Sequence, residues 1–182
     1  QKAEELYERS LRIREKVLGE EHPDTAAGYN NLAGVYESQG KYQKAEELYE
    51  RSLRIREKVL GEEHPDTAAG YHNLAGVYKR QGKYQKSEEL YEKSLRISEK
   101  VLGEEHPDTA VSYHNLALLY ADRGEYKKAL GYCFKAFRIY ELRFGAGHPH
   151  TQDIFSNLQI IYSKWDSEGS FIHWLEEKMK QK

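Results

Sequence analysis

The chain has 182 residues, enough for one ordinary domain with a buried core, and its 28 Lys and Arg residues nearly balance 30 Asp and Glu residues. Charges of both signs are interleaved and no basic run occurs, which argues against nucleic acid or an anionic membrane as a partner. No apolar run approaches the roughly 20 residues that a membrane-spanning helix needs. The single cysteine, Cys133, cannot form an intramolecular disulfide, which favours a reducing, cytoplasmic location.

An internal repeat of 42 residues organises the sequence as far as about residue 162. Residues 1–42 and 43–84 differ at three positions only, and residues 85–126 follow the same template with more drift. Units of this length bury their apolar faces by stacking on one another. The opening residues contain no Met and recur inside the second repeat, so we expect a piece of a longer array.

Each period contains a short first helix and a longer second helix. We expect a lone second helix at 1–18, helix pairs at 24–60, 66–102 and 108–144, and a divergent repeat with a capping helix at 150–180. In the first pair, Tyr29, Leu32 and Tyr36 lie on one stripe of a helix. Since no alternating strand pattern occurs in the sequence, we predict an all-α chain that forms a single repeat domain over residues 1–182.

A known repeat family shares this pattern. The motif Y-x-x-L-A-x-x-Y at 29–36, followed by A-x-x-x-Y at 45–49, resembles the tetratricopeptide repeat. The 42-residue period is similar to the variety found in kinesin light chains and in many bacterial multi-repeat proteins. The resemblance implies a right-handed superhelical solenoid of stacked antiparallel helix pairs. It also implies that the first helices line a concave groove in which partners usually bind.

The stretch LGEEHPDTA, which occurs three times and first at 18–26, places a histidine beside a carboxylate. Such a histidine could be a metal ligand or half of an acid–base pair. We favour a structural joint, because Gly19 ends one helix and Pro23 fits the first turn of the next, where Asp24 or Thr25 can cap it. Equivalent histidines of stacked repeats would lie about 8–10 Å apart, too far to share one zinc ion.

No catalytic constellation accompanies the repeats. The glycines are isolated helix stops and form no phosphate-binding loop. Cys133 takes the template position of Tyr91, which favours a buried packing role over a nucleophile. We therefore predict no enzyme activity, no cofactor and no metal site.

The three differences between the first two repeats all fall on the first helix, beside its buried stripe. His72 stands in place of Asn30, Lys79 in place of Glu37 and Arg80 in place of Ser38. The second helix does not differ between these two repeats. This favours the interpretation that the groove positions of the first helix are under selection of their own. The alternative is that these three positions are merely exposed.

An asparagine recurs at one position of each first helix. Its side chain carries a donor and an acceptor, so a ladder of four could pair with the backbone of an extended peptide. Basic neighbours would then favour acidic side chains on that peptide. Each asparagine could instead bond to the adjacent repeat and hold the stacking, and both interpretations remain open. The candidate peptide-binding residues are Asn30, Asn31, His72, Asn73, Lys79, Arg80, His114, Asn115 and Asn157.

We therefore expect a non-catalytic scaffold that binds an extended peptide or a helix of a protein partner in the concave groove. The alternative is a structural module whose exposed ends stack head to tail into a homo-oligomer. Light scattering against concentration separates the two, because a strict monomer excludes the second.

Overall fold

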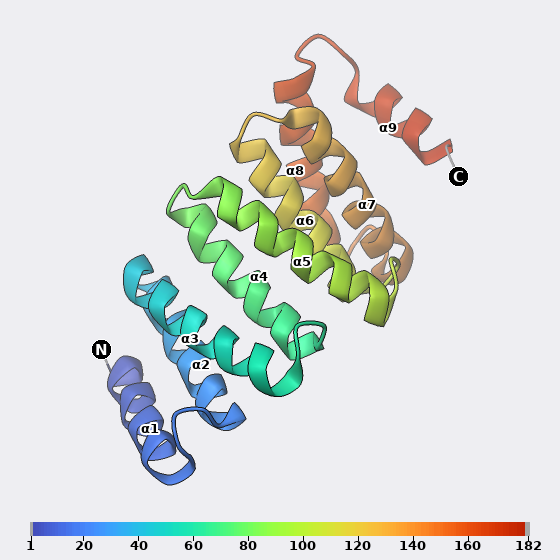
Figure 1. Cartoon of the computed structure of the whole chain (residues 1–182). Helices are drawn as coiled ribbons and strands as arrows, with labels where there is room; N and C mark the ends of the chain where they lie inside the picture. The colour runs from blue at the N-terminus through green and yellow to red at the C-terminus, as the bar shows by residue number, and fades with distance from the viewer. Residues whose placement is uncertain (1, 181–182) are drawn as a thin grey trace. The chain divides into compact units, whose positions relative to one another are not determined.

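The structure, a computed structural model, describes residues 2–180; residue 1 of the first predicted helix and residues 181–182 of the predicted domain lie outside the described residues. Within that range the chain forms nine α-helices and no strand, which confirms the predicted all-α class (Figure 1). The helices are α1 (Lys2–Leu18), α2 (Pro23–Ser38), α3 (Tyr42–Leu60), α4 (Pro65–Arg80), α5 (Tyr84–Leu102), α6 (Pro107–Asp122), α7 (Tyr126–Phe144), α8 (Pro149–Trp165) and α9 (Phe171–Lys180).

The helices group into two compact units, Gln1–Val101 and Leu102–Lys182. In the first unit α1 packs on α2, α2 on α3 and α3 on α4, and in the second α6 packs on α7 and α7 on α8. The pairs α2–α3 and α6–α7, each a first helix with the second helix that follows it, therefore form packed hairpins. The single domain over residues 1–182 stays a prediction.

Proline and glycine set the ends of the helices. Each first helix begins at a proline, as Pro65 does in α4, one residue earlier than predicted. Proline suits this place because its missing N–H would have no partner in the first turn. Gly61 follows α3 with a φ of 90°, a backbone conformation that costs glycine little because it has no Cβ.

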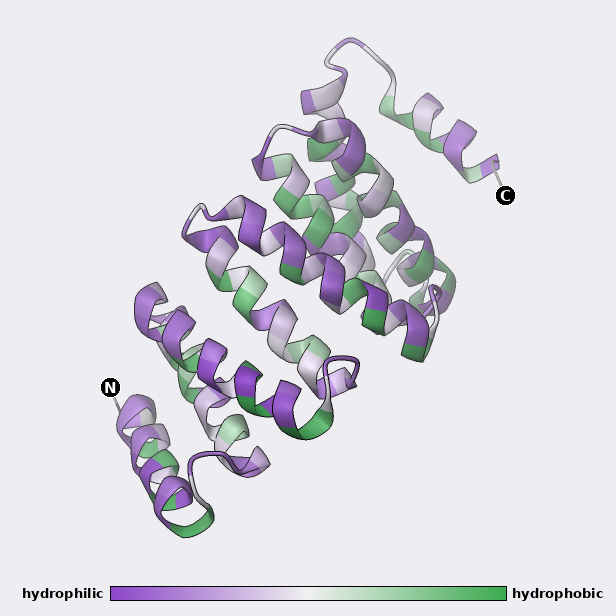
Figure 2. Ribbon diagram, in the orientation of Figure 1, coloured by the Kyte–Doolittle hydropathy of each residue, from purple (hydrophilic) through white to green (hydrophobic). Residues whose placement is uncertain are grey.

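Small residues allow close packing between helices of the first unit. Ala33 and Ala75 are completely buried, and a Cβ atom added to Gly70 on α4 would lie 3.0 Å from Leu53 Cδ1 on α3. The second helices α3 and α5 are strongly hydrophilic along the side seen in Figure 2. The apolar stripes of both helix types therefore meet in the interior, as the sequence period predicts.

Buried tyrosines connect neighbouring repeats. Tyr71 Oη on α4 donates to Glu57 Oε1 on α3 at 2.7 Å, and Tyr78 Oη donates to Glu50 Oε1 at 2.9 Å. Each ring fills apolar space while its hydroxyl is satisfied by a carboxylate at the helix surface, which is how buried tyrosines are normally accommodated.

The second unit has a core of its own and ends in a lightly packed helix. Leu116, Cys133 and Leu158 are fully buried between α6, α7 and α8. The last helix, α9, contacts the rest through aromatic rings, including Trp174 against Phe134 on α7, but none of its residues is buried. None of the helices in the described range combines the length and the apolar character that crossing a bilayer requires.

Candidate interaction surface

The histidine of the repeated joint is the N-cap of the next helix. His22 Nδ1 accepts a hydrogen bond from the backbone N of Asp24 at 3.1 Å, and His64 and His106 make the same bond at the same distance. His22 precedes a proline and has an extended backbone, φ −76° and ψ 141°, which aims its ring at the first turn. The ring must be unprotonated at Nδ1 to accept this bond.

This geometry corrects one detail of the sequence prediction, which assigned the cap to Asp24 or Thr25. Thr25 Oγ1 instead donates to the carbonyl of Gly19 at 2.8 Å and ties the two helices at the turn. The cap moves back by two or three residues because the helix begins at Pro23. Among residues 2–180 no three His, Cys, Asp or Glu side chains lie together as metal ligands would.

The candidate peptide-binding residues lie on the first helices, as predicted. In the first unit Asn30 and Asn31 are on α2, and His72, Asn73, Lys79 and Arg80 are on α4. Asn31 and Arg80 are exposed, and the other four are half-buried. In the second unit His114 and Asn115 are on α6 and Asn157 is on α8, all half-buried.

Two of the ladder asparagines bond to the preceding repeat. Asn73 Nδ2 donates to Asn30 Oδ1 at 3.0 Å, from α4 to α2. Asn157 Nδ2 lies 3.1 Å from His114 Nε2, from α8 to α6, in the same relation along the chain. These contacts support the interpretation that the asparagines hold adjacent repeats together. Each amide still has a second N–H and acceptor capacity on its oxygen.

Asn115 also bonds within its own helix. Its Nδ2 donates to the carbonyl of Val111, one turn earlier on α6, at 3.0 Å.

A second link between the repeats involves the charged positions. Arg80 Nε on α4 donates to Glu37 Oε1 on α2 at 3.2 Å, and Tyr49 Oη on α3 donates to Glu37 Oε2 at 3.2 Å. Glu37 was among the differing positions but was not a candidate site residue. The signal that could have identified it is the opposite charge at position 80, one repeat and one residue later.

His72 packs against an aromatic ring, and its burial disfavours the charged form of the imidazole. Its ring meets Tyr91 edge to face, with centroids 5.4 Å apart, and burial lowers the pKa of its imidazole. Lys79 and Arg80 are the lysine and arginine among the candidate residues of the first unit.

Cys133 is a packing residue. It is completely buried, burial raises the pKa of its thiol to about 12, and its Sγ donates to the carbonyl of Ile154 at 3.6 Å. A thiol nucleophile acts as the thiolate and needs access, and Cys133 has neither property.

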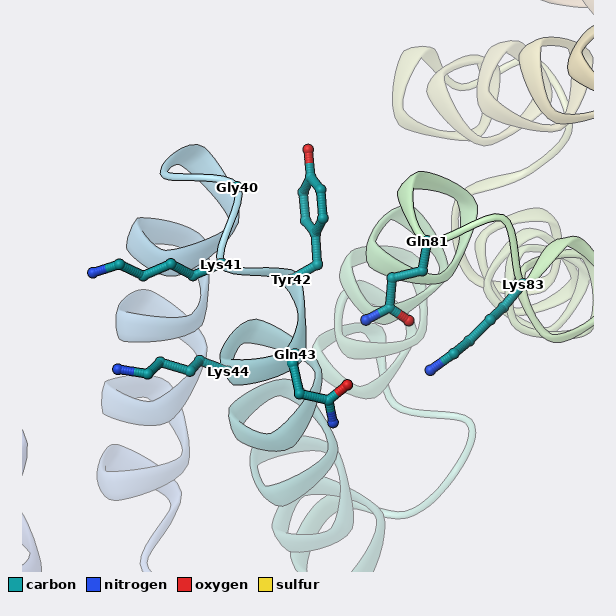
Figure 3. A pocket seen from close by; sticks show the side chains of 7 residues that line it. All are labelled: Gly40, Lys41, Tyr42, Gln43, Lys44, Gln81 and Lys83. Atoms are coloured by element: carbon teal, nitrogen blue, oxygen red, sulfur yellow. The ribbon is translucent and has the colours of Figure 1, made fainter.

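A hollow near the turn between α2 and α3 is lined by several lysines (Figure 3). Lys41 Nζ donates to Glu4 on α1 at 3.0 Å, and Lys83 Nζ donates to Glu46 on α3 at 2.8 Å. In Figure 3, Lys41 extends to one side of the turn and Lys83 lies on the other. Two of the lysines that line the hollow, Lys41 and Lys83, are thus already paired with carboxylates.

Comparison with known proteins identifies the repeat. A family model described as tetratricopeptide repeat matches residues 1–58, 26–86 and 66–142. No curated protein matches the sequence.

Solved structures have the same fold. The putative kinesin light chain with nearly identical TPR-like repeats from Podosopora anserina is 30% identical, with a TM-score of 0.79 over 100% of this chain and 89% of that one. BtubC (BKLC) from P. vanneervenii is 30% identical, with a TM-score of 0.80 over 90% of this chain; the match covers 65% of the BtubC chain. RapI in its apo form is 24% identical, with a TM-score of 0.72 over 86% of this chain and 56% of its own, which shows the fold alone.

These matches confirm the predicted architecture of stacked antiparallel helix pairs. Together with the nine helices of the described range, they show that this chain belongs to the tetratricopeptide repeat family and that its 42-residue repeat is of the kinesin light chain-like type.

Proposed function

We propose that this chain is a non-catalytic scaffold that binds an extended peptide or a helix along the first helices of its repeats. The proposal depends on one observation. The first two repeats are identical except at three positions, and all three lie on α2 and α4, whereas the second helices α1 and α3 do not differ over residues 2–18 and 44–60. Tetratricopeptide repeats are generally protein-interaction scaffolds, which supports the same function.

The chemistry of this face favours acidic partners in the first unit. Lys79 is half-buried and Arg80 is exposed near the C-terminal end of α4, while Asn31 exposes an amide on α2. An extended peptide would offer its backbone to the amides and its carboxylates to the two cations. In the second unit the corresponding amides belong to Asn115 and Asn157.

A peptide selection tests this proposal. A phage-displayed library of random peptides is selected on the full chain, and the enriched peptides are measured by fluorescence anisotropy. We expect acidic peptides, whose affinity falls by about tenfold or more in the variant Lys79→Glu with Arg80→Glu, since both favourable charges are reversed. The control Arg54→Glu changes an exposed residue of α3 and should leave the affinity unchanged. Peptides that bind the charge-reversed variant as tightly as the parent chain would contradict the proposal.

End-to-end self-assembly is the second candidate, and exposed apolar residues of α1 favour it. Tyr7 is 42% exposed and Ile13 is 55% exposed. Sedimentation of the chain over a range of concentrations tests it, because a mass that stays at one protomer excludes it. A cytoplasmic location belongs to the main proposal and is supported by the free, buried thiol of Cys133.

A further inference from the structure

Two tyrosines of the first unit occupy the same position of the repeat but differ in their hydrogen bonds. Tyr49 on α3 and Tyr91 on α5 are one repeat apart, and both are buried. A Cβ atom added to Gly34 would lie 3.5 Å from Tyr49 Oη, and one added to Gly76 would lie 3.5 Å from Tyr91 Oη. Each hydroxyl is therefore held at the same place beside the first helix of its own repeat.

The hydrogen bond of the first hydroxyl has no counterpart in the second repeat. Tyr49 Oη donates to Glu37 Oε2 at 3.2 Å. Lys79 takes the position of Glu37 in the next repeat, and an ammonium group has no lone pair with which to accept a hydrogen bond. In the part of the first unit that the structure describes, Tyr91 Oη makes no hydrogen bond. The second repeat thus holds the same phenol without the carboxylate that pairs with it in the first.

Polar groups of the first-helix face surround the Tyr91 hydroxyl. Beyond the backbone of its own turn, a Cβ atom on Gly76 would have two atoms within 4 Å, Tyr91 Oη at 3.5 Å and Glu37 Oε1 at 3.8 Å. Arg80, one turn after Gly76 on α4, donates from Nε to the same Glu37 oxygen at 3.2 Å, and its side chain is 59% exposed. The Nη groups of this guanidinium carry further N–H donors. The space over Gly76 is therefore open and lies between a phenol and a guanidinium.

Both charged groups act on the Tyr91 phenol. Burial and the Glu37 carboxylate raise the pKa of Tyr91, and the Arg80 guanidinium lowers it. The guanidinium is thus close enough to Tyr91 for one small anion to contact both.

We propose that Gly76, Arg80 and Tyr91, called the Gly76 subsite, bind one aspartate or glutamate side chain of the peptide partner. This inference rests on the proposed function, and it adds a second-helix residue, Tyr91, that selects the side chain. The carboxylate accepts from Tyr91 Oη, as Glu37 accepts from Tyr49, and from the Nη groups of Arg80 in a charge-assisted pair. Gly76 has no side chain, so the partner can come close to α4 at this point.

The neighbouring repeats do not offer the same subsite. In the first, the carboxylate of Glu37 already accepts from the equivalent tyrosine. In the third, Leu118 replaces the glycine and Cys133 replaces the tyrosine, so both the open space and the hydroxyl are lost. A peptide that lies along these three repeats should therefore need an acidic residue at one place only.

A double-mutant cycle between the chain and a peptide tests the inference. The probe is the tightest peptide of the phage selection described above, labelled with fluorescein and followed by anisotropy. Each aspartate and glutamate of the peptide is replaced in turn by alanine, and binding to the parent chain and to Tyr91→Phe is measured. We expect one acidic position whose replacement weakens binding to the parent chain by about thirtyfold but binding to Tyr91→Phe by about fivefold or less. The two losses differ because the two changes remove opposite ends of the same hydrogen bond.

Matched variants separate the subsite from general effects on the fold. Tyr49→Phe removes the same hydroxyl where Glu37 already accepts its bond, so no acidic position of the peptide should couple to it. Gly76→Leu reproduces Leu118 of the third repeat and should weaken the peptide by about tenfold or more, because the leucine fills the space of the carboxylate. Circular dichroism should show the helix content of the parent chain for each variant.

The subsite and the proposed function fail in different ways. Peptides that need Lys79 and Arg80 but lose equal affinity for the parent chain and Tyr91→Phe at every acidic position would overturn the subsite and leave the proposed function standing. Unchanged binding to Gly76→Leu, or a coupling of the same size to Tyr49→Phe, would do the same. A selection that yields no peptide, or peptides indifferent to the charge reversal, would overturn both.

Discussion

At the scale of single residues, the repeated histidine shows that a side chain typical of metal binding or acid–base catalysis can instead cap a helix. Serine, threonine, aspartate and asparagine are the usual N-caps, because each offers an oxygen to the second or third backbone N–H. His64 offers Nδ1 to the N of Asp66 at 3.1 Å, and Pro65 between them fixes the turn. One of the two ring nitrogens that could bind a metal, Nδ1, is thus used as an acceptor within the protein.

Replacing this cap should cost stability in a way that depends on the acceptor. We expect His64→Ala to lower the free energy of unfolding by about 1 kcal/mol, because the N–H of Asp66 loses its partner. His64→Asn should retain most of the stability, since asparagine is a preferred N-cap. Urea unfolding followed by circular dichroism measures both variants. An equal loss for alanine and asparagine would mean that the ring packs rather than caps.

The sequence predicted that the joint is structural but not which atom completes it. Glycine and proline locate a turn only to within a residue or two. A shift of that size in the start of the helix changes which residue is the N-cap. The pairing of Asn73 with Asn30 was also out of reach, because partners 43 residues apart are not at the same position of the template. That offset depends on how the helices of neighbouring repeats are staggered. The sequence of one repeat carries no information about this stagger.

At the scale of helices, the 42-residue period and the apolar stripes predicted all nine elements of the described range, including α9 at the divergent end. The period could not predict which glycines serve close packing. Gly70 lies where α4 meets Leu53 of α3, whereas a Cβ added to Gly131 in α7 would point into open space, with no neighbouring side chain within 4 Å. Both are helical glycines, so their sequence context alone does not separate them.

This pair of glycines predicts opposite effects of the same substitution. Gly131→Ala should raise the free energy of unfolding by about 0.5–1 kcal/mol, because alanine favours a helix and nothing obstructs its methyl group. Gly70→Ala gains the same propensity but places Cβ 3.0 Å from the buried Leu53, and overpacking costs about 1–3 kcal/mol. Gly70→Ala should therefore be less stable than Gly131→Ala by at least about 1 kcal/mol in urea unfolding. Equal gains would show that Leu53 moves aside freely.

At the scale of the whole molecule, one arrangement recurs along the repeats. A tyrosine ring is buried between helices, and its hydroxyl group lies at a polar helix surface. Burial is the main cause that raises the pKa of Tyr36 and of Tyr91 to about 12, and nearby carboxylates add to it. Tyr49, Tyr71 and Tyr78 are shifted in the same direction for the same reason. The fold therefore holds these phenols neutral.

The shared direction of these shifts predicts that the chain is sensitive to alkali. A phenol whose pKa is about 10 in the unfolded chain and higher in the fold contributes stability that is fully present below pH 10 and is lost as pH rises. For Tyr91, with a folded pKa of about 12, the loss between pH 9 and pH 11 is about 1.3 kcal/mol. Tyr91→Phe cannot ionise, so its free energy of unfolding should fall by about that much less over the same interval. Urea unfolding of both proteins at pH 7, 9 and 11 measures the difference, with pH 7 as the control for the lost hydroxyl. Parallel losses in the two proteins would mean that Tyr91 reaches solvent before the fold opens, and that its burial against α4 does not hold its proton.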